Sequence, residues 1–163
     1  MNTQQKEKGF TIIEVVLVLA IAGLIFLMVF IALPALQRSQ RDTQRQQDMS
    51  RAQTAIQNYQ STNRGQIPTT DAQWDALANS YLRAGGDQFT DPSGKEYVFV
   101  EEDDIVAVPS VVDATESDQD EVRIYYTNGA TCSTGGAVED GQGSRKVALR
   151  LVLEGGGVAC VNN

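Results

Sequence analysis

The sequence predicts an α+β protein in which one very long N-terminal helix continues into a small head built around an antiparallel β-sheet. Three observations predict this fold class. An apolar run of membrane length passes without a break into a helical repeat, and turn residues at positions 63–65 end that helix. Short segments rich in β-branched and aromatic residues then follow within positions 97–153.

The apolar run covers positions 15–36, where no side chain carries a charge. As a helix it rises roughly 33 Å, which matches the hydrocarbon core of a bilayer. It is longer than the ~7–15 residue core of a secretory signal peptide, and no A-x-A-like cleavage site follows it. We therefore expect residues 10–36 to cross a membrane and residues 37–63 to continue the same helix as an amphipathic segment.

One carboxylate, that of Glu14, lies at the start of this apolar region, and the next charged side chain is that of Arg38. A lone charge in hydrocarbon costs at least ~2.5 kcal/mol, so carboxylates within membrane segments usually serve a function. The sequence therefore predicts a partner for Glu14. The alternative is a neutral glutamic acid that is merely tolerated near the membrane surface.

Residues Lys8 to Glu14 read KGFTIIE: a basic residue, Gly9, the aromatic Phe10, and a glutamate five positions after the glycine. This combination just before a membrane span resembles the class III signal of type IV prepilins. The resemblance implies that a prepilin peptidase and N-methyltransferase removes residues 1–9 by cutting between Gly9 and Phe10, and methylates the new amine of Phe10. It also implies a pilin-like lollipop in which the second half of the helix packs against the head.

The family resemblance supplies the expected partner of Glu14, because cleavage would create a positive amine on Phe10. When helices pack side by side, the carboxylate of one subunit can reach the Phe10 ammonium of a neighbour. In a low-dielectric environment such a pair discriminates against wrong axial registers, although desolvation of both groups can cancel its net attraction. We therefore expect Phe10 and Glu14 to act in registration and assembly.

Gly23 and Pro34 are candidate soft points within the span. Glycine costs about 1 kcal/mol relative to alanine in a helix, and proline removes one backbone hydrogen bond. In related pilins the segment between a mid-span glycine and a following proline can lose helicity in the filament, although Pro34 lies further from Glu14 than in the common family pattern. The alternative is an ordinary transmembrane glycine and proline.

Beyond the span, basic and apolar side chains share one stripe of the helix at spacings of three and four. They are Arg38, Arg41, Arg45, Met49, Ala52, Ile56 and Tyr59. We expect the head to cover this stripe from Met49 onward and the arginines before it to stay free for lipid headgroups or acidic neighbours. Pairs along the helix, such as Asp42 with Arg45, are the alternative role, at about 0.2–0.5 kcal/mol each.

Residues 64–163 are enough for one compact head and too few for two domains. Thr70 and Gln73 form a candidate capping box for a short helix, which Gly85 and Gly86 end. The predicted strands are Tyr97 to Val100, Val122 to Thr127 and Val147 to Leu153. Alternation in the last strand points its apolar side chains to one face and Arg150 to the other.

The segment between the first two predicted strands is long, acidic and weakly patterned, so we expect a surface loop. Its acidic positions include Glu101, Glu102, Asp103, Asp104, Asp113, Glu116, Asp118 and Asp120. Because some secretion pseudopilins bind calcium near their C-termini, the resemblance allows a structural Ca²⁺ here. No EF-hand loop is present, and a solvated acidic loop explains the same residues. We expect no other cofactor and no metal site.

Only two cysteines occur, Cys132 after the second predicted strand and Cys160 near the C-terminal end. An exported head is in an oxidising environment, and a bond between them would tie the C-terminal segment to the sheet. The resemblance agrees, since many pilins carry a disulfide-bounded C-terminal region. Two free thiols are the alternative.

Charge and composition argue against several classes of function. Residues 64–163 contain 7 lysines and arginines against 17 aspartates and glutamates, a net charge of −10, and such a surface repels nucleic-acid phosphates. We therefore expect no direct nucleic-acid binding by the head. The chain has no histidine and no G-x-S-x-G, P-loop or dinucleotide-binding motif, so we expect no enzymatic activity.

These observations and the resemblance together predict a structural subunit of a type IV pilus-like extracellular filament. The subunit would rest in the cytoplasmic membrane among lipids, and an assembly platform and motor would then add it to identical or homologous subunits. Adhesion, motility and DNA uptake are all compatible with this role. The alternatives are a type II secretion pseudopilin, a minor or tip pilin and, from another class, a membrane-anchored binding module that never polymerises.

Overall fold

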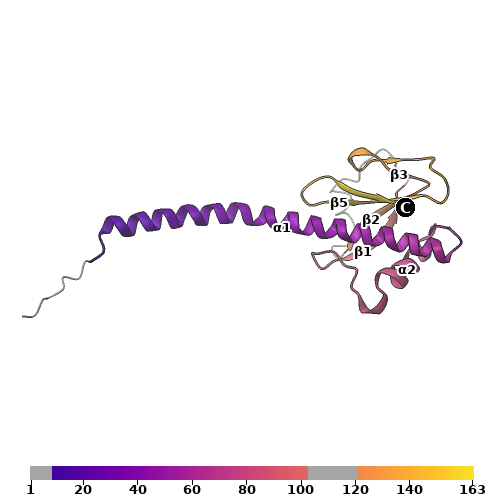
Figure 1. The fold of residues 1–163 in the computed structure, drawn as a ribbon, viewed down its shortest axis with the longest axis horizontal. Helices are drawn as coiled ribbons and strands as arrows, with labels where there is room; N and C mark the ends of the chain where they lie inside the picture. Colours follow the sequence, from indigo (N-terminus) through magenta and orange to yellow (C-terminus); the bar gives the residue numbers. More distant parts are fainter. Residues whose placement is uncertain (1–8, 103–120) are drawn as a thin grey trace, which may run out of the picture. The chain divides into compact units, whose positions relative to one another are not determined.

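The structure of the protein, a computed structural model, describes residues 9–102 and 121–163 (Figure 1). The chain divides into two compact units, residues 1–37 and residues 38–163. The first element, helix α1, is 51 residues long, runs over Ile12–Thr62 and contributes to both units. The remaining helices and all strands belong to the second unit, which we call the head. The predicted α+β class with a long N-terminal helix is confirmed.

Helix α1 ends at the predicted stop signal. Arg64 and Gly65 adopt left-handed backbone angles, with φ of 57° and 79°. The Gly65 amide donates to the carbonyl of Gln60 at 2.7 Å, and the Asn63 amide donates to the carbonyl of Tyr59 at 2.9 Å. Backbone amides therefore satisfy these carbonyls of the last turn, and the side chains of Thr62 and Asn63 also donate to the Tyr59 carbonyl, at 3.0 and 2.9 Å.

A short helical segment follows α1. It consists of the α-helix α2, Asp71–Leu77, the π-helical turn η1, Ala78–Leu82, and the 3-10 turn η2, Ala84–Gly86. Thr70 is the N-cap of α2, but its side chain makes no capping bond. Gln73 Oε1 instead accepts from the amide and hydroxyl of Thr69, at 2.8 and 3.2 Å. The predicted capping box between Thr70 and Gln73 is therefore wrong: the Gln73 side chain reaches past the cap to Thr69, and the N-cap side chain makes no bond to the helix.

Four strands form the main sheet, in the order β1–β2–β5–β6. They are β1, Glu96–Glu101; β2, Glu121–Asn128; β5, Val147–Val152; and β6, Val158–Asn162. β5 pairs antiparallel with both β2 and β6, but β1 pairs with β2 in parallel, with Tyr97 opposite Val122. The sheet is mixed, so the prediction of an antiparallel sheet is wrong for this pair. A parallel pair needs a connection of about a dozen residues or more, and residues 102–120 are numerous enough to supply it.

The sequence pattern does not predict β6 or the small second sheet of β3, Thr131–Cys132, and β4, Val138–Glu139. The glycines at 155–157 form the predicted turn, and the Leu153 amide donates to the Gly157 carbonyl at 3.1 Å. After this turn the chain returns along β5. Strands β3 and β4 are too short for an alternating pattern to show in the sequence, so they depend on their pairing partners.

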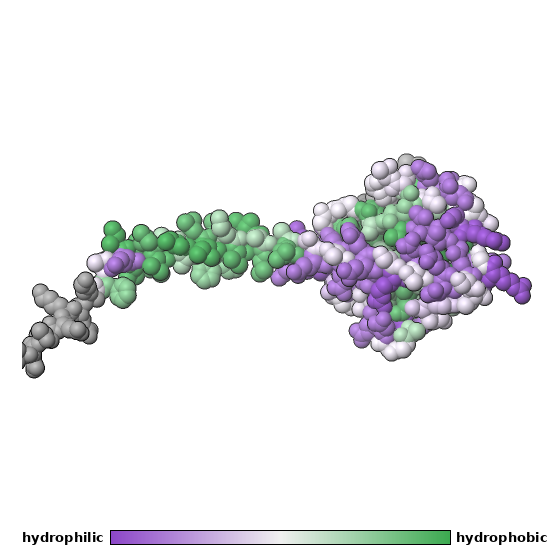
Figure 2. Space-filling model, viewed as in Figure 1, coloured by the Kyte–Doolittle hydropathy of each residue, from purple (hydrophilic) through white to green (hydrophobic). Residues whose placement is uncertain are grey.

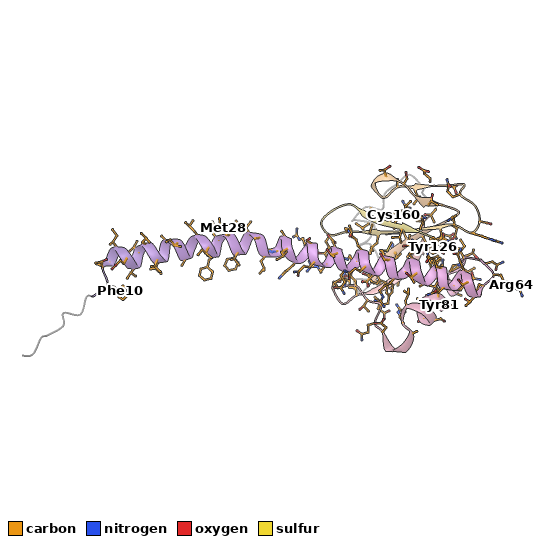
Figure 3. The ribbon with its side chains drawn as sticks, in the orientation of Figure 1. Phe10, Met28, Arg64, Tyr81, Tyr126 and Cys160 are labelled. Atoms are coloured by element: carbon orange, nitrogen blue, oxygen red, sulfur yellow. A yellow bond between two sulfur atoms is a disulfide. The ribbon has the colours of Figure 1, made fainter. Side chains whose placement is uncertain are left out.

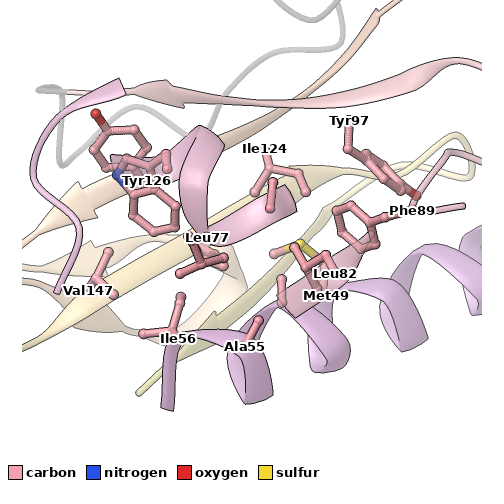
Figure 4. Close-up of a cluster of buried hydrophobic side chains, with 14 of the residues drawn as sticks. Met49, Ala55, Ile56, Leu77, Leu82, Phe89, Tyr97, Ile124, Tyr126 and Val147 are labelled. Carbon is pink, nitrogen blue, oxygen red and sulfur yellow. The ribbon is translucent and has the colours of Figure 1, made fainter. Parts of the chain in front are cut away.

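The main core lies where α1, the α2–η1 segment and the main sheet meet (Figure 4). Its members include Met49, Ala52, Ala55, Ile56, Trp74, Leu77, Ala78, Leu82, Tyr97, Ile124, Tyr126, Val147, Leu149 and Leu151. The Trp74 ring lies 4.8 Å from that of Phe99 and 4.5 Å from that of Tyr126, measured between centroids. Each fully buried large apolar side chain contributes about 1.5–3 kcal/mol. The apolar half of the predicted stripe is therefore confirmed as the face of α1 that packs in the head.

The opposite face of the main sheet is covered as well. A small cluster of Ala130, Val138 and Ala148 packs there against a disulfide between Cys132 and Cys160, whose Cα atoms are 5.8 Å apart (Figure 3). The predicted disulfide is confirmed, and it fastens β6 to β3. Arg150 lies on this face, as the alternation predicts, but it is completely buried.

Candidate functional site

The first candidate site is the N-terminal part of α1 with the three described residues before it, Gly9, Phe10 and Thr11. Large apolar side chains cover this part of the helix and are exposed, as Figure 2 shows: those of Phe10, Phe30 and Leu36 are 89%, 75% and 56% exposed. By length and composition, α1 is able to cross a membrane, and no second helix of residues 9–102 and 121–163 is. A helix that is apolar all round requires lipid or protein around it.

Glu14 lies in the first turn of α1 and bonds to Thr11, the residue before the helix. Its Oε2 accepts from the Thr11 amide and hydroxyl, both at 2.8 Å, and the Thr11 hydroxyl accepts from the Glu14 amide at 3.4 Å. This reciprocal pair is a capping box. The predicted partner of Glu14 lies in another chain, whereas this partner, Thr11, lies in the same chain and is signalled by the local pattern Thr-x-x-Glu. The carboxylate is thereby held at the N-terminal end of the helix.

Gly9 and Phe10 lie just before the helix, in backbone without regular structure. Among the described residues other than its chain neighbour, no atom lies within 4 Å of the position that a Cβ on Gly9 would take. Phe10 and Glu14 of one chain line the same shallow apolar hollow, together with Val15, Val18 and Leu19. The structure thus brings together the two residues that the sequence assigns to registration. Cleavage, methylation and registration at these positions stay predictions.

Gly23 and Pro34 both lie inside α1, which runs through them without interruption. Between them the helix is regular, and the exposed side chain of Met28 marks this stretch in Figure 3. The predicted softening concerns the helix once it is packed in a filament, and it stays a prediction.

The second candidate site is a group of polar and charged side chains where α1 enters the head, which we call the charged cluster. It consists of Arg41, Asp42, Arg45, Asp48, Asp91, Tyr97 and Glu154. Arg45 is its centre and is only 6% exposed. Its Nε and Nη2 donate to Asp91 at 2.6 and 3.0 Å, and Nη2 lies 2.9 Å from Glu154 Oε1. The two-pronged contact with Asp91 is among the strongest hydrogen-bond geometries in proteins.

The charged cluster also fixes the hairpin between β5 and β6 to α1. Asp42 accepts from the backbone amides of Glu154 and Gly155, both at 2.8 Å. Arg41 donates to the Glu154 carboxylate from Nη2 at 2.6 Å and from Nε at 3.0 Å. A Cβ on Gly155 would come within 2.9 Å of Asp42 Oδ2, so this close approach requires glycine.

The charged cluster shifts the pKa values of its carboxyl groups in opposite directions. Burial alone would raise the pKa of Asp91, but the hydrogen bonds that it accepts, from Arg45 above all, outweigh burial and lower the pKa. The hydrogen bond from Arg41 lowers the pKa of Glu154. Burial raises the pKa of Asp48. Asp91 and Glu154 are therefore held as carboxylates at neutral pH, whereas ionised Asp48 costs the fold stability.

These contacts correct the prediction that the arginines before Met49 stay free, for two of the three. Arg41 and Arg45 are both paired, and the buried face of α1 begins at Asp42. The predicted pair along the helix, Asp42 with Arg45, exists at 3.5 Å but is the longest ionic contact that Arg45 makes. Its main partner, Asp91, is 46 positions away in the sequence. A pattern along one helix contains no information about such a partner.

The acidic positions considered for calcium fall mostly outside the described residues, namely Asp103, Asp104, Asp113, Glu116, Asp118 and Asp120. Within the part of the chain that the structure describes, no group of three or more His, Cys, Asp or Glu side chains is arranged to hold a metal ion. Glu101 lies at the end of β1 and accepts from the Asn128 side chain at 3.4 Å. The described residues therefore give no support for a calcium site.

The first candidate site lies within a segment that matches a known family. Residues 4–30 match the family described as the prokaryotic N-terminal methylation motif. The match includes Gly9, Phe10, Glu14 and Gly23. No match was found among curated proteins or among solved structures.

Proposed function

We propose that this chain is a type IV pilin or pseudopilin and serves as a structural subunit of a type IV pilus-like filament, because residues 4–30 match the N-terminal methylation motif. The N-terminal methylation motif is typical of this family, whose members are structural, non-enzymatic proteins. The fold is pilin-like, with a long N-terminal helix packed against a small mixed β-sheet.

The first step of the proposed pathway is processing of the precursor. A prepilin peptidase removes residues 1–9 and methylates the amine of Phe10. The open surroundings of Gly9 support this step, because a protease must draw the chain into its cleft in an extended form. Phe10 precedes the helix, so the bond to be cut is not protected by helical hydrogen bonds.

The second step moves the mature helix from lipid to protein. Before assembly, residues 10–36 span the cytoplasmic membrane. Afterwards the same apolar side chains pack against identical or homologous subunits in a filament outside the cell. The exposed apolar surface of this segment supports both states, since it is satisfied equally by lipid and by other apolar helices. An assembly platform and its motor supply the work of extraction.

The observation that carries the proposal is the position of Glu14, a carboxylate held at the end of an apolar helix beside Phe10. Processing places an ammonium on Phe10, and in a filament Glu14 of one subunit pairs with the Phe10 ammonium of the next. A pair of this kind in low dielectric is sensitive to distance, so it favours one axial register.

Mass spectrometry of the cellular protein tests this function. The expected result is a mature chain that begins at N-methylated Phe10 and is recovered from sheared extracellular fibres. The variant Gly9→Val should accumulate uncut in the membrane, whereas the matched variant Gly23→Val should be cut normally. An intact N-terminus in the membrane, with no fibres when the maturation machinery is present, would contradict the proposal. Processed protein retained in the envelope would assign the chain to the pseudopilins instead.

A further inference from the structure

A polar pocket lies in the head at the C-terminal end of α1, where Figure 3 labels Arg64. Its volume is about 430 Å³, and it is lined by Tyr59, Arg64, Gln66, Ile67, Thr69, Gln73, Ser144 and Arg145. None of these lining residues is acidic. This absence is informative, because residues 64–163 carry a net charge of −10.

Arg64 and Arg145 bring two guanidinium groups to the pocket. Within residues 9–102 and 121–163, neither guanidinium forms an ion pair or a hydrogen bond. By contrast, Arg41, Arg45 and Arg51 of α1 each pair with a carboxylate at 2.8 Å or less. The pocket therefore combines two uncommitted positive groups in a head that is rich in carboxylates.

The backbone of Arg64 is a second, independent observation. Arg64 is the only non-glycine residue with positive φ in the part of the chain that the structure describes. Glycine or asparagine is the usual choice at such a helix end, and a bulky residue there costs stability. The Arg64 side chain is not needed to cap the helix, because the amides of Asn63 and Gly65 already donate to carbonyls of the last turn. Arginine at this position therefore calls for a reason beyond the fold.

The remaining lining residues suit a ligand larger than a bare anion. Gln73 Oε1 accepts from Thr69, so its Nε2 group is left as a donor, and Ser144 adds a hydroxyl. Tyr59, whose ring makes an edge contact with that of Tyr81, is an aromatic residue of the pocket lining. The volume falls in the ~300–1,000 Å³ range of small-molecule sites. Amides, hydroxyls and an aromatic ring are groups that recognise a sugar ring, and guanidinium recognises carboxylate and phosphate.

We propose that this pocket binds a sugar-sized ligand that carries one carboxylate or phosphate group. Arg64 and Arg145 contact the anionic group, and the polar groups of Gln73 and Ser144 contact the hydroxyl groups of the sugar. The proposal goes beyond a structural role in a filament and does not depend on it, because the pocket lies within one head.

Isothermal titration calorimetry on the full chain in detergent micelles tests the proposal. The probes are glucuronate and glucose 6-phosphate, with glucose and inorganic phosphate as controls. At least one acidic sugar should bind saturably and about tenfold more tightly than either control, since each control lacks one of the two recognised features. Tighter binding of glucuronate would identify the anionic group as a carboxylate, and tighter binding of glucose 6-phosphate would identify it as a phosphate. Failure of both to bind, or equal binding by glucose or by phosphate alone, would overturn the proposal.

Three variants separate a binding role from a structural one. Arg64→Gly removes a guanidinium and relieves the strain of the left-handed backbone. It should therefore raise the Tm and weaken the binding of the acidic sugar about tenfold or more. Arg145→Gln should weaken binding with little change in Tm. Arg123→Gln removes one positive charge from β2, outside the pocket, and should bind like the parent chain. Unchanged binding in Arg64→Gly and Arg145→Gln, or equal loss in Arg123→Gln, would contradict the assignment. None of these results depends on filament formation.

Discussion

Helix α1 carries charged residues in two regions, and these two regions differ in how far the charged groups and their surroundings are buried and in where their bonding partners lie. In the N-terminal region the single carboxylate, Glu14, bonds to Thr11 and to no other described residue, and the apolar side chains around it are exposed. In the head, Asp42 and Arg45 are at most 9% exposed, and each bonds to groups far away in the same chain.

In the head, the chain itself supplies the partners of the charged side chains of α1. In the N-terminal region it leaves the apolar side chains of α1 exposed. Burying a charge without partners costs several kcal/mol, so the buried charges of the head must be satisfied within the head. The N-terminal region keeps its carboxylate at the surface of the single chain, where burial must await another molecule. We therefore expect substitutions in the head to change stability and substitutions near Glu14 to change assembly.

The largest effect should come from Arg45→Met, which breaks the centre of the charged cluster. Removing one partner of a buried pair leaves the other charge uncompensated, and the expected loss is about 3–5 kcal/mol in the free energy of unfolding. Urea unfolding of the full chain in detergent micelles, followed by the fluorescence of the single tryptophan, Trp74, measures it.

The double variant Arg45→Met with Asp91→Asn is the control for this first prediction. Asparagine keeps the shape of Asp91 and can still accept from Ser93, whose amide lies 2.9 Å from Asp91 Oδ1. Because the Asp91 carboxylate is then no longer left without Arg45, the free energy of unfolding should fall less in the double variant than in the single variant Arg45→Met. An equal or larger loss would show that packing, rather than charge, explains the role of Arg45.

The second prediction concerns assembly and rests on the proposed function. Glu14→Leu should change the free energy of unfolding of the head by no more than about 0.5 kcal/mol, since the hydrogen bonds of Glu14 go to Thr11, outside the head. Incorporation into fibres should fall at least about tenfold, because coupling energies of close charge pairs reach about 1.5 kcal/mol or more. Quantifying the subunit in sheared fibres and in membranes measures both pools.

Glu14→Gln distinguishes the two roles open to this carboxylate. Glutamine can replace glutamate in a capping box, so it keeps the bonds with Thr11 but removes the charge. If the charge sets the register, fibres should be lost as in Glu14→Leu. Restored assembly in Glu14→Gln would instead assign Glu14 to helix capping and end the registration proposal.

A smaller effect should follow from Gly155→Ala, which tests the contact between α1 and the β5–β6 hairpin. The new Cβ would lie 2.9 Å from Asp42 Oδ2, and that carboxylate cannot move without lengthening its bonds to the Glu154 and Gly155 amides. We expect a loss of about 1–2 kcal/mol in the free energy of unfolding. When Asp42→Ala is already present, Gly155→Ala should lower the free energy of unfolding clearly less, because the carboxylate that the new Cβ would meet is absent.

The smallest effect is the response of head stability to acid. The pKa values of Asp91 and Glu154 are lowered in the folded head, so their contribution is complete above the unfolded values of about 3.9 and 4.3 and is lost as the pH falls through the folded values. Asp48, with a raised pKa, acts in the opposite sense, since its protonation favours the fold. Stability should therefore fall below about pH 4, and Asp91→Asn should flatten this fall. Urea midpoints measured across this pH range give the slope.

Much of the architecture could be predicted because it depends on residues that are near one another in the sequence. The apolar run, the stop at Arg64 and Gly65 and the three longer strands follow from periodicity and turn chemistry. The prediction failed where two distant segments meet. The parallel pairing of β1 with β2 and the partners of Arg45 cannot be read from either segment alone. The capping box of Glu14 is different, because the signal Thr-x-x-Glu was local and was overlooked.

The sequence by itself determined the long helix, its membrane-length apolar half and the methylation motif, because each depends on residues that are neighbours along the chain. Only the tertiary structure decided which charges of α1 are buried, which strand neighbours β1, and that two uncommitted arginines share one pocket. The physical reason is that burial and ion pairing are properties of groups brought together in space. A one-dimensional pattern records what a segment can do, and the fold selects which of those contacts are made.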